Sequence, residues 1–380
     1  MKRITLTVLA LAAALCCYAQ VPAGQEVKAF AGEAYATPHE SYTPSFGIDG
    51  SDAQIRNVIL MIGDGMGVGA VNAAMYANGG TLTMTNLRTM GYVRTQAANN
   101  FTTDSAASGT AYATGHKTNK GYVGMGPDKS RLANLPEKLE PLGFACGVLS
   151  TDNLHGATPA SFFAHQLSRR DYDNIWADLP SSKLIFASAG THSKFEMLPV
   201  ATQEAISAKF NVIFSTEGNE AVVKKSKRLV YLPESVMEDR GDYLPATTEM
   251  AIEYLSSRCK KGFFLMVEGA RIDIAEHNND FQGMVNEALD FDKAVEAAIR
   301  FAEKDGHTLV IISADHETGA VTLSDGAPED HYVGGTFASK GHSPIMVPLF
   351  AYGPHSNEFV GCQENSDISN KIFAILSGRK

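Results

Sequence analysis

The segment Val58–Gly67 constrains this chain more than any other stretch, because an apolar run ends in an acid between two glycines. Val58–Ile62 has the unbroken apolar character of a strand that is buried on both faces. Asp64 follows, with Gly63 before it and Gly65 after it. A carboxylate at the end of a buried strand is unfavourable unless a positive charge meets it, and the glycines let a ligand approach closely. The sequence therefore predicts that Asp64 binds a metal ion.

Three other apolar runs also end in polar residues, and each run is typical of a buried strand. They are residues 145–150 before Thr151-Asp152, residues 263–267 before Glu268, and residues 308–313 before Asp315-His316. Ligands bind at the carboxyl ends of the strands in open α/β sheets. We therefore expect these polar endings to lie at one edge of a sheet, beside Asp64.

Predicted strands alternate with predicted helices along the chain. The clearest helix is 281–305, where apolar residues recur at near-helical spacing and Gly306 follows. Another helix is predicted from Thr158 through Arg170. The alternation favours an α/β fold with a doubly wound, largely parallel central sheet and helices on both faces. We divide the chain into a signal peptide at residues 1–19, an N-terminal arm or linker at 20–54 and a single domain at 55–380.

The N-terminus has the parts of a cleaved signal peptide, namely basic Lys2-Arg3, an apolar stretch at 4–15 and a small-residue cleavage site at 17–19. The stretch is too short to span a membrane, so we predict export to a periplasm or to the outside. Cleavage leaves an odd number of cysteines and no indicated disulfide framework.

A net charge of −10 argues against general nucleic-acid binding. Anionic substrates remain compatible, because bound cations reverse the local potential.

Histidines and acids at particular spacings strengthen the metal prediction. Asp273 and His277 lie four residues apart, so on a helix both side chains reach one ion, although such a pair can also be an ordinary exposed one. Asp315, His316 and His342 add the ligand types that suit Zn²⁺. Acids combined with a hydroxyl form a harder, oxygen-only set that suits Mg²⁺. The residue types therefore predict two zinc sites and a magnesium site.

Ser105 lies in a segment of small residues, 102–115, that begins as a loop and continues as a helix. A serine in such a segment is most often a loop or cap residue, and either Asp104 or Ser105 is predicted near the helix N-cap. The predicted metal pair gives Ser105 a second interpretation, because a zinc ion can hold a serine as a nucleophilic alkoxide.

Taken together, the motifs of this chain resemble those of the alkaline phosphatase family, in the family's order, from about Asn57 to the C-terminus. The segments that carry the resemblance are residues 62–67, 103–108, 157–160, 267–277, 314–316 and 341–342. The resemblance implies that the domain at 55–380 is catalytic, has the family's three-layer α/β sandwich and hydrolyses small phosphate monoesters.

The resemblance also implies a role for individual residues. Ser105 is expected to become phosphoserine, and Arg169 to clamp the phosphate. The expected ligands are Asp273, His277 and His342 for one zinc, Asp64, Asp315 and His316 for the other, and Thr158 and Glu268, with Asp64 bridging, for magnesium.

Two positions depart from the family's pattern. Family members often have Asp or His two residues before the magnesium-binding Thr or Ser, and this chain has Gly156 there. They commonly have Lys, His or Trp directly after the first zinc-ligand Asp, and this chain has Ile274 there. Both positions support the third metal. The chain is also shorter than many members, which leaves its oligomeric state open between homodimer and monomer.

Rival hypotheses are a phosphodiesterase or sulfatase of the same fold, and a zinc- or phosphate-binding protein without catalysis. Ser105 with Arg169 favours monoesters.

Overall fold

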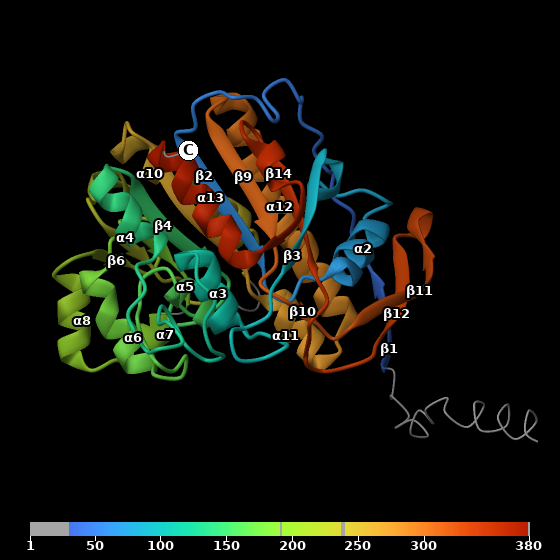
Figure 1. Ribbon diagram of the computed structural model, residues 1–380, viewed down its shortest axis with the longest axis horizontal. Coiled ribbons are helices and arrows are strands. Elements are labelled where there is room, and N and C mark those ends of the chain that lie inside the picture. Colours follow the sequence, from blue (N-terminus) through green and yellow to red (C-terminus); the bar gives the residue numbers. More distant parts are fainter. Residues whose placement is uncertain (1–29, 191, 237–239, 379–380) are drawn as a thin grey trace, which may run out of the picture.

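The computed structural model describes residues 30–190, 192–236 and 240–378. The predicted signal peptide and the first part of the predicted arm lie outside these ranges. A ten-stranded sheet with helices on both faces forms the centre of the molecule, as expected (Figure 1). None of the described helices combines the length and apolar character that a membrane span needs. Cys146 is buried, and the cysteines of the described part are free thiols.

The strands of this sheet lie in the order β15-β3-β14-β9-β2-β8-β4-β5-β7-β6. Within the described residues, β14 is antiparallel to both of its neighbours and every other pairing in this sheet is parallel. The strands are β2 Asn57–Gly63, β3 Thr89–Arg94, β4 Ala145–Ser150, β5 Phe186–Ser188, β6 Asn211–Ile213, β7 Leu229–Tyr231, β8 Phe263–Gly269, β9 Thr308–Ser313, β14 Val347–Tyr352 and β15 Gly361–Glu364. Every residue of β2 is buried, because β8 and β9 flank it and helices cover both faces.

Helices form the two outer layers. One layer contains α2 Val68–Ala77, α10 Tyr243–Arg258 and α12 Phe281–Asp305, and the other contains α3 Ser105–Thr114, α4 Leu135–Leu139 and α13 Asn365–Ser377. The remaining helices lie in connections: α5 Ala157–Ala160, α6 Tyr172–Asp178, α7 His192–Glu196, α8 Val200–Ser207, α9 Glu220–Lys225 and α11 Arg271–Asn278. The predicted bounds of α12 are confirmed, and Gly306 ends it in the left-handed conformation at φ 72°.

Two small sheets pair segments that are far apart in sequence. In the first, β1 Phe30–Tyr35 and β11 Val321–Ala327 flank β12 Tyr332–Phe337. The sequence did not predict β1, since its partner lies some 300 residues further on. In the second, β10 Glu317–Thr318 pairs with β13 His342–Ser343. This pairing sets Thr318 opposite His342, and so brings His342 back beside His316.

The predicted helix from Thr158 through Arg170 is wrong beyond its first turn, because α5 ends at Ala160. The chain then turns, and the backbone groups of Gln166 and Val123 bond to each other at 2.8 and 2.9 Å. The Arg169 amide donates to the Gly121 carbonyl at 2.7 Å. These bonds to a distant loop replace the helical ladder and carry Arg169 towards α3.

Candidate active site

The polar strand endings meet at one edge of the sheet, as predicted. Strands β9, β2, β8 and β4 are consecutive neighbours in the sheet. Glu268 of β8 pairs with Ile62 of β2 on one side and Ser150 of β4 on the other. The residues that follow these strands, Asp64 and Asp315 among them, therefore emerge together.

Asp64, Asp315 and His316 form the more deeply buried group, which we call the inner cluster. His316 Nε2 lies 3.4 Å from an Asp64 oxygen and 3.3 Å from an Asp315 oxygen. Within the described part of the chain, one buried oxygen of each aspartate makes no hydrogen bond. Buried carboxylate oxygens are almost always paired, so these two point to a missing positive partner.

Asp273, His277 and His342 form a second group, the outer cluster. His277 Nε2 lies 3.2 Å from Asp273 Oδ2 and also 3.2 Å from His342 Nε2. The most compact ligand set on this side combines Asp273 and His342 with His316, which belongs to the inner cluster. The clusters are thus contiguous, with the more exposed His277 at the rim.

Backbone carbonyls fix the tautomers of the two outer histidines. Nδ1 of His277 faces the Lys340 carbonyl, and Nδ1 of His342 faces the Thr103 carbonyl at 2.9 Å. Because a carbonyl only accepts, each Nδ1 carries the proton. Each Nε2 then presents a lone pair to the space between the clusters, which is how a ligating histidine is normally oriented.

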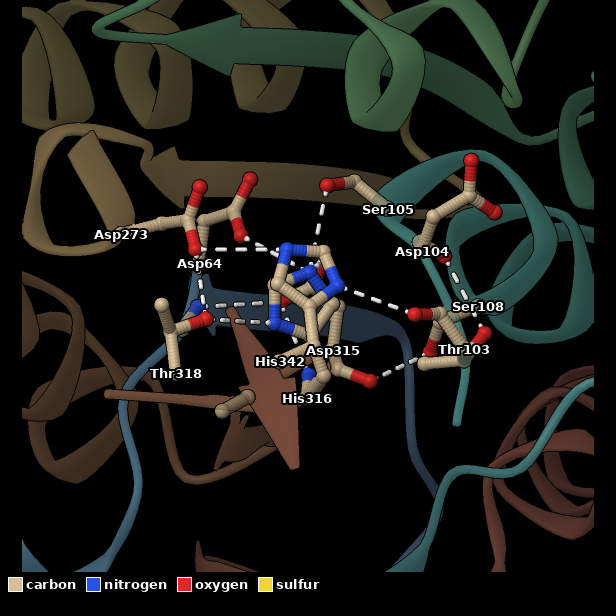
Figure 2. A network of polar contacts seen from close by, with 12 residues as sticks. Asp64, Thr103, Asp104, Ser105, Ser108, Asp273, Asp315, His316, Thr318 and His342 are labelled. Atoms are coloured by element: carbon tan, nitrogen blue, oxygen red, sulfur yellow. Dashed lines mark hydrogen bonds and ion pairs between the residues drawn. The ribbon is translucent and has the colours of Figure 1, made fainter. Parts of the chain in front are cut away.

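Thr318 joins the two clusters from beneath, as Figure 2 shows. Its hydroxyl donates to Asp273 Oδ1 at 2.6 Å and lies 3.1 Å from His316 Nδ1. The His316 Nδ1 proton can in turn be donated to this hydroxyl oxygen. One buried side chain thus orients a ligand candidate in each cluster.

Burial and neighbouring negative charges oppose ionisation of the acids in the inner cluster. Burial, and then the charge of Asp315, raise the pKa of Asp64 well above its usual range. Burial and the charge of Asp273 raise the pKa of Asp315 to about 7. Burial lowers the pKa of His316, so its ring is neutral and able to ligate. Crowded carboxylates with neutral imidazoles and unpaired oxygens fit divalent cations, and the mixed nitrogen and oxygen donors suit Zn²⁺.

Ser105 lies beside the inner cluster as the first residue of α3. Asp104 caps the helix by accepting from the Ala107 amide at 3.0 Å, which confirms the predicted N-cap. Ser105 is buried, and its Oγ lies 3.3 Å from His316 Nε2 (Figure 2). The amino end of a helix favours negative charge, so this position suits a phosphoryl group.

Arg169 reaches the same place from the loop after α5. Its Nη1 lies 3.4 Å from Asp104 Oδ2, and its side chain is 37% exposed. Burial lowers the pKa of Arg169, but the charges of Asp104 and Asp64 outweigh that effect and raise it. The guanidinium therefore stays charged at the mouth of the site.

A third group of polar side chains lies on the β4 side of the sheet. The Glu268 carboxylate accepts a short hydrogen bond from the Ser150 hydroxyl. Burial and the charge of Asp152 raise the pKa of Glu268 to about 8. The buried Thr158 hydroxyl lies near Glu268 but makes no hydrogen bond of good geometry within the described residues. These oxygen-only donors suit Mg²⁺.

Three contributors were missed by reasoning from the sequence. Thr318 had a usable signal, because residues two apart on an extended segment share a face and His316 is two before it. Asp104 was predicted only as a cap, although it also holds Arg169. Asp152 was noted as a strand ending and given no role. No local pattern announces these last two contacts, since each depends on a segment distant in sequence.

Comparison with known proteins finds similar sequences. The sequence matches the family described as "Alkaline phosphatase" over residues 55–215 and 238–335. Alkaline phosphatase 4 of Bacillus subtilis (strain 168) is 30% identical over 420 residues, covering 86% of this chain and 90% of that protein.

Solved structures agree as well. The alkaline phosphatase of the Antarctic bacterium TAB5 matches with a TM-score of 0.80 and 32% identity, over 87% of this chain and 99% of that one. A variant of that enzyme with Mg bound in the M3 site gives a TM-score of 0.79 at 32% identity, with the same coverage of both chains.

Proposed function

The chain belongs to the alkaline phosphatase family and is a phosphoric monoester hydrolase, and we propose that it works through a phosphoserine on Ser105 beside two bound zinc ions. The observation that carries this proposal is the position of the Ser105 hydroxyl, 3.3 Å from His316 and at the amino end of α3. Small phosphorylated molecules are the expected substrates.

The reaction proceeds in two displacements. The Ser105 oxygen attacks phosphorus and forms a new P–O bond, while the bond from phosphorus to the substrate oxygen breaks and the alcohol leaves with a proton. Water then attacks the phosphoserine, the Ser105–phosphorus bond breaks, and inorganic phosphate is released. Two easier steps replace one difficult hydrolysis.

The residues of this chain orient the phosphoryl group for both steps. Arg169 offers two parallel N–H donors to two phosphoryl oxygens, and Asp104 fixes the direction of that fork. The amino end of α3 adds positive potential at Ser105. The phosphorus of a diester carries two non-bridging oxygens that share one negative charge, whereas a monoester dianion carries three that share two. The charge of Arg169 therefore favours monoesters.

The metal ions are assigned by donor type. We propose that one zinc is held by Asp64, Asp315 and His316, the other by Asp273, His277 and His342, and a magnesium by Thr158 and Glu268. Zn²⁺ in these positions supplies Lewis-acid charge that makes the serine hydroxyl more acidic and balances charge on the reacting oxygens. We also propose that residues 1–19 direct export of the protein.

Trapping the covalent intermediate tests the role of Ser105. The protein is mixed with an aryl phosphate, quenched in acid and digested, and mass spectrometry locates the phosphate. We expect it on the Ser105 peptide, and Ser105→Ala should lose that signal and at least about 10⁴-fold in kcat. Zinc content should not change.

Ser108→Ala, which removes a buried hydroxyl one turn further along α3, is the matched control and should still be phosphorylated on Ser105. Phosphate on another residue, or full turnover by Ser105→Ala, contradicts the proposal.

The substrate class is tested by kcat/KM on an aryl phosphate and on the matching aryl diester. We expect kcat/KM to be much higher on the monoester than on the diester. In Arg169→Ala this ratio should fall about 10- to 100-fold, because charge-assisted hydrogen bonds to the phosphoryl group are lost. A diester preference would keep the metal assignment and overturn the substrate class. Equal kinetics of Arg169→Ala and the unaltered protein would remove Arg169 from the mechanism.

A further inference from the structure

The space beside Gly156, where a side chain at this position would lie, is occupied by Asp152. Its backbone, at φ −54° and ψ 149°, is a conformation that any residue adopts, so glycine is not required there by the turn. A Cβ atom built on Gly156 would lie 2.2 Å from Asp152 Oδ2 and 2.8 Å from the Asn153 carbonyl oxygen. The carboxylate of Asp152 therefore occupies the volume that a side chain at position 156 would need.

The backbone around Asp152 holds this carboxylate in place. The Asp152 amide donates to Ser150 Oγ at 2.8 Å, and the Gly190 amide donates to the Asp152 carbonyl at 2.5 Å. Ser150 Oγ is the group that donates to Glu268, so one hydroxyl connects the two acidic residues. Asp152 thus belongs to the same bonded network as Glu268.

The surroundings of Asp152 call for a cation. Among individual residues, the charge of Asp152 has the largest effect on the pKa of buried Glu268, which it raises. Ser150 Oγ links the Asp152 amide to the Glu268 carboxylate. The fully buried Thr158 hydroxyl is beside Glu268 and makes no hydrogen bond of good geometry within the described residues. Arg169 and Arg271 are the positive side chains that act on Asp152. Two acids and a hydroxyl make a hard, oxygen-only donor set, which suits Mg²⁺ better than Zn²⁺.

We propose that Asp152 supplies a carboxylate to the third cation site, together with Glu268 and Thr158, from the space beside Gly156. This inference rests on the proposed function in one respect, the presence of that third cation. It assigns the binding of this cation to the second residue after β4, because Gly156 has no side chain to offer. The competing role for Asp152 is an ion pair with Arg169 and Arg271 that involves no metal.

Calorimetric titration with Mg²⁺ of the full chain, saturated beforehand with zinc, separates these roles. Asp152→Asn keeps the shape of the side chain and removes its charge. We expect its Mg²⁺ dissociation constant to rise about 10- to 100-fold while zinc content is unchanged. Asp173→Asn, an exposed carboxylate on α6, is the matched control and should bind Mg²⁺ like the unaltered protein. An Mg²⁺ affinity of Asp152→Asn within twofold of the unaltered value, or no Mg²⁺ binding by the unaltered protein, overturns the inference.

Moving the carboxylate tests the shared space directly. Asp152→Ala alone should bind Mg²⁺ more weakly than the unaltered protein. The double variant with Gly156→Asp should bind Mg²⁺ at least about tenfold more tightly than Asp152→Ala does. The new side chain requires a small shift of the Asn153 carbonyl. Thermal unfolding checks that both variants fold. A folded double variant that recovers nothing overturns the claim that the two positions serve one site.

These measurements stay distinct from those on the proposed function. A chain that binds two zinc ions and Mg²⁺ but forms no phosphoserine would overturn the proposed function and leave the role of Asp152 standing. A chain that forms phosphoserine while Asp152→Asn keeps full Mg²⁺ affinity would overturn this inference alone.

Discussion

The inner and outer clusters lie side by side, yet the fold encloses them very differently. In the inner cluster the side chains of Asp315 and His316 are 0% exposed, whereas in the outer cluster His277 is 36% exposed. Inner residues directly follow β2 and β9, two neighbouring strands of the central sheet. Outer residues lie on α11, which packs against α12, and on β13, which pairs with β10. Exposure therefore rises from His316 through His342 to His277, whereas Asp64 and Asp273 are similarly buried.

This difference matches the division of labour that the proposed reaction requires. The proposed nucleophile Ser105 is buried and contacts the inner cluster, where a buried surround strengthens every electrostatic interaction. The alcohol must leave and water must enter, and both need a route to solvent. His277 of the outer cluster and Arg169 at the mouth of the site are both partly exposed, whereas the side chains of Asp315 and His316 are not. We infer that the nucleophile is activated at the buried inner cluster and that the alcohol and water exchange with solvent at the more exposed outer cluster.

Complete removal of metal should have the largest effect of all. A chelator should abolish turnover, and zinc should leave in two phases, with the outer ion first because His277 is accessible. Free energy of unfolding should fall by about 4 kcal/mol for an ion present at 1,000 times its dissociation constant, since only the folded chain binds it. A zinc-indicator dye and denaturant unfolding measure both. Release of all zinc in a single phase would mean that the clusters do not differ.

Asp315→Asn should have the next largest effect, because it removes a charged ligand from the sealed inner cluster. We expect a loss of about 10³-fold in kcat, with loss of one zinc that excess metal restores poorly. Kinetics and metal analysis of the purified protein provide the measurement. Asp325→Asn, on the exposed strand β11, is the control and should change neither quantity. If Asp315→Asn kept both zinc ions, the inner ligand set would be wrong.

His277→Gln should have a smaller and reversible effect, because the outer cluster keeps Asp273 and His342 and has access to solvent. A loss of about 10- to 100-fold is expected, with activity regained as zinc is raised. His355→Gln removes an imidazole from the surface and serves as the control. A loss as large and as permanent as that of Asp315→Asn would erase the distinction between the clusters.

The same contrast explains what the sequence could predict. The proposed inner ligands follow unbroken apolar strands, so the apolar runs located them, and parallel pairing of β2 with β9 brings them together. The long amphipathic helix α12 was likewise predicted from a local period. The outer site depends on β10 pairing with β13, and the sequence reveals no such pairing between residues far apart. Only the resemblance to a family placed His342 there.

The errors have a common physical cause, which is contact between distant segments. The helix predicted through Arg170 satisfied local preferences, but the backbone of Gln166 bonds to the Val123 loop instead. Strand β1 lacked any period of its own and forms because β12 offers it a free edge. Asp152 followed a predicted strand, yet its hydrogen-bonded link to Glu268 through Ser150 joins β4 to β8, which are far apart in sequence.

Thr318→Val should have the smallest effect and tests how the clusters are joined. The valine has nearly the same shape but removes the hydrogen bond that Thr318 donates to Asp273 Oδ1 and the partner of His316 Nδ1 at a fully buried position. We expect a loss of about tenfold in kcat/KM, the lower end for a group that orients metal ligands. Because Thr318 contacts one ligand of each cluster, both phases of zinc release should become faster together. Thr322→Val, which breaks an exposed Thr322–Thr336 pair on β11, controls for the substitution itself. Acceleration of the outer phase alone would show that Thr318 orients Asp273 and that the inner cluster is held by the sheet without it.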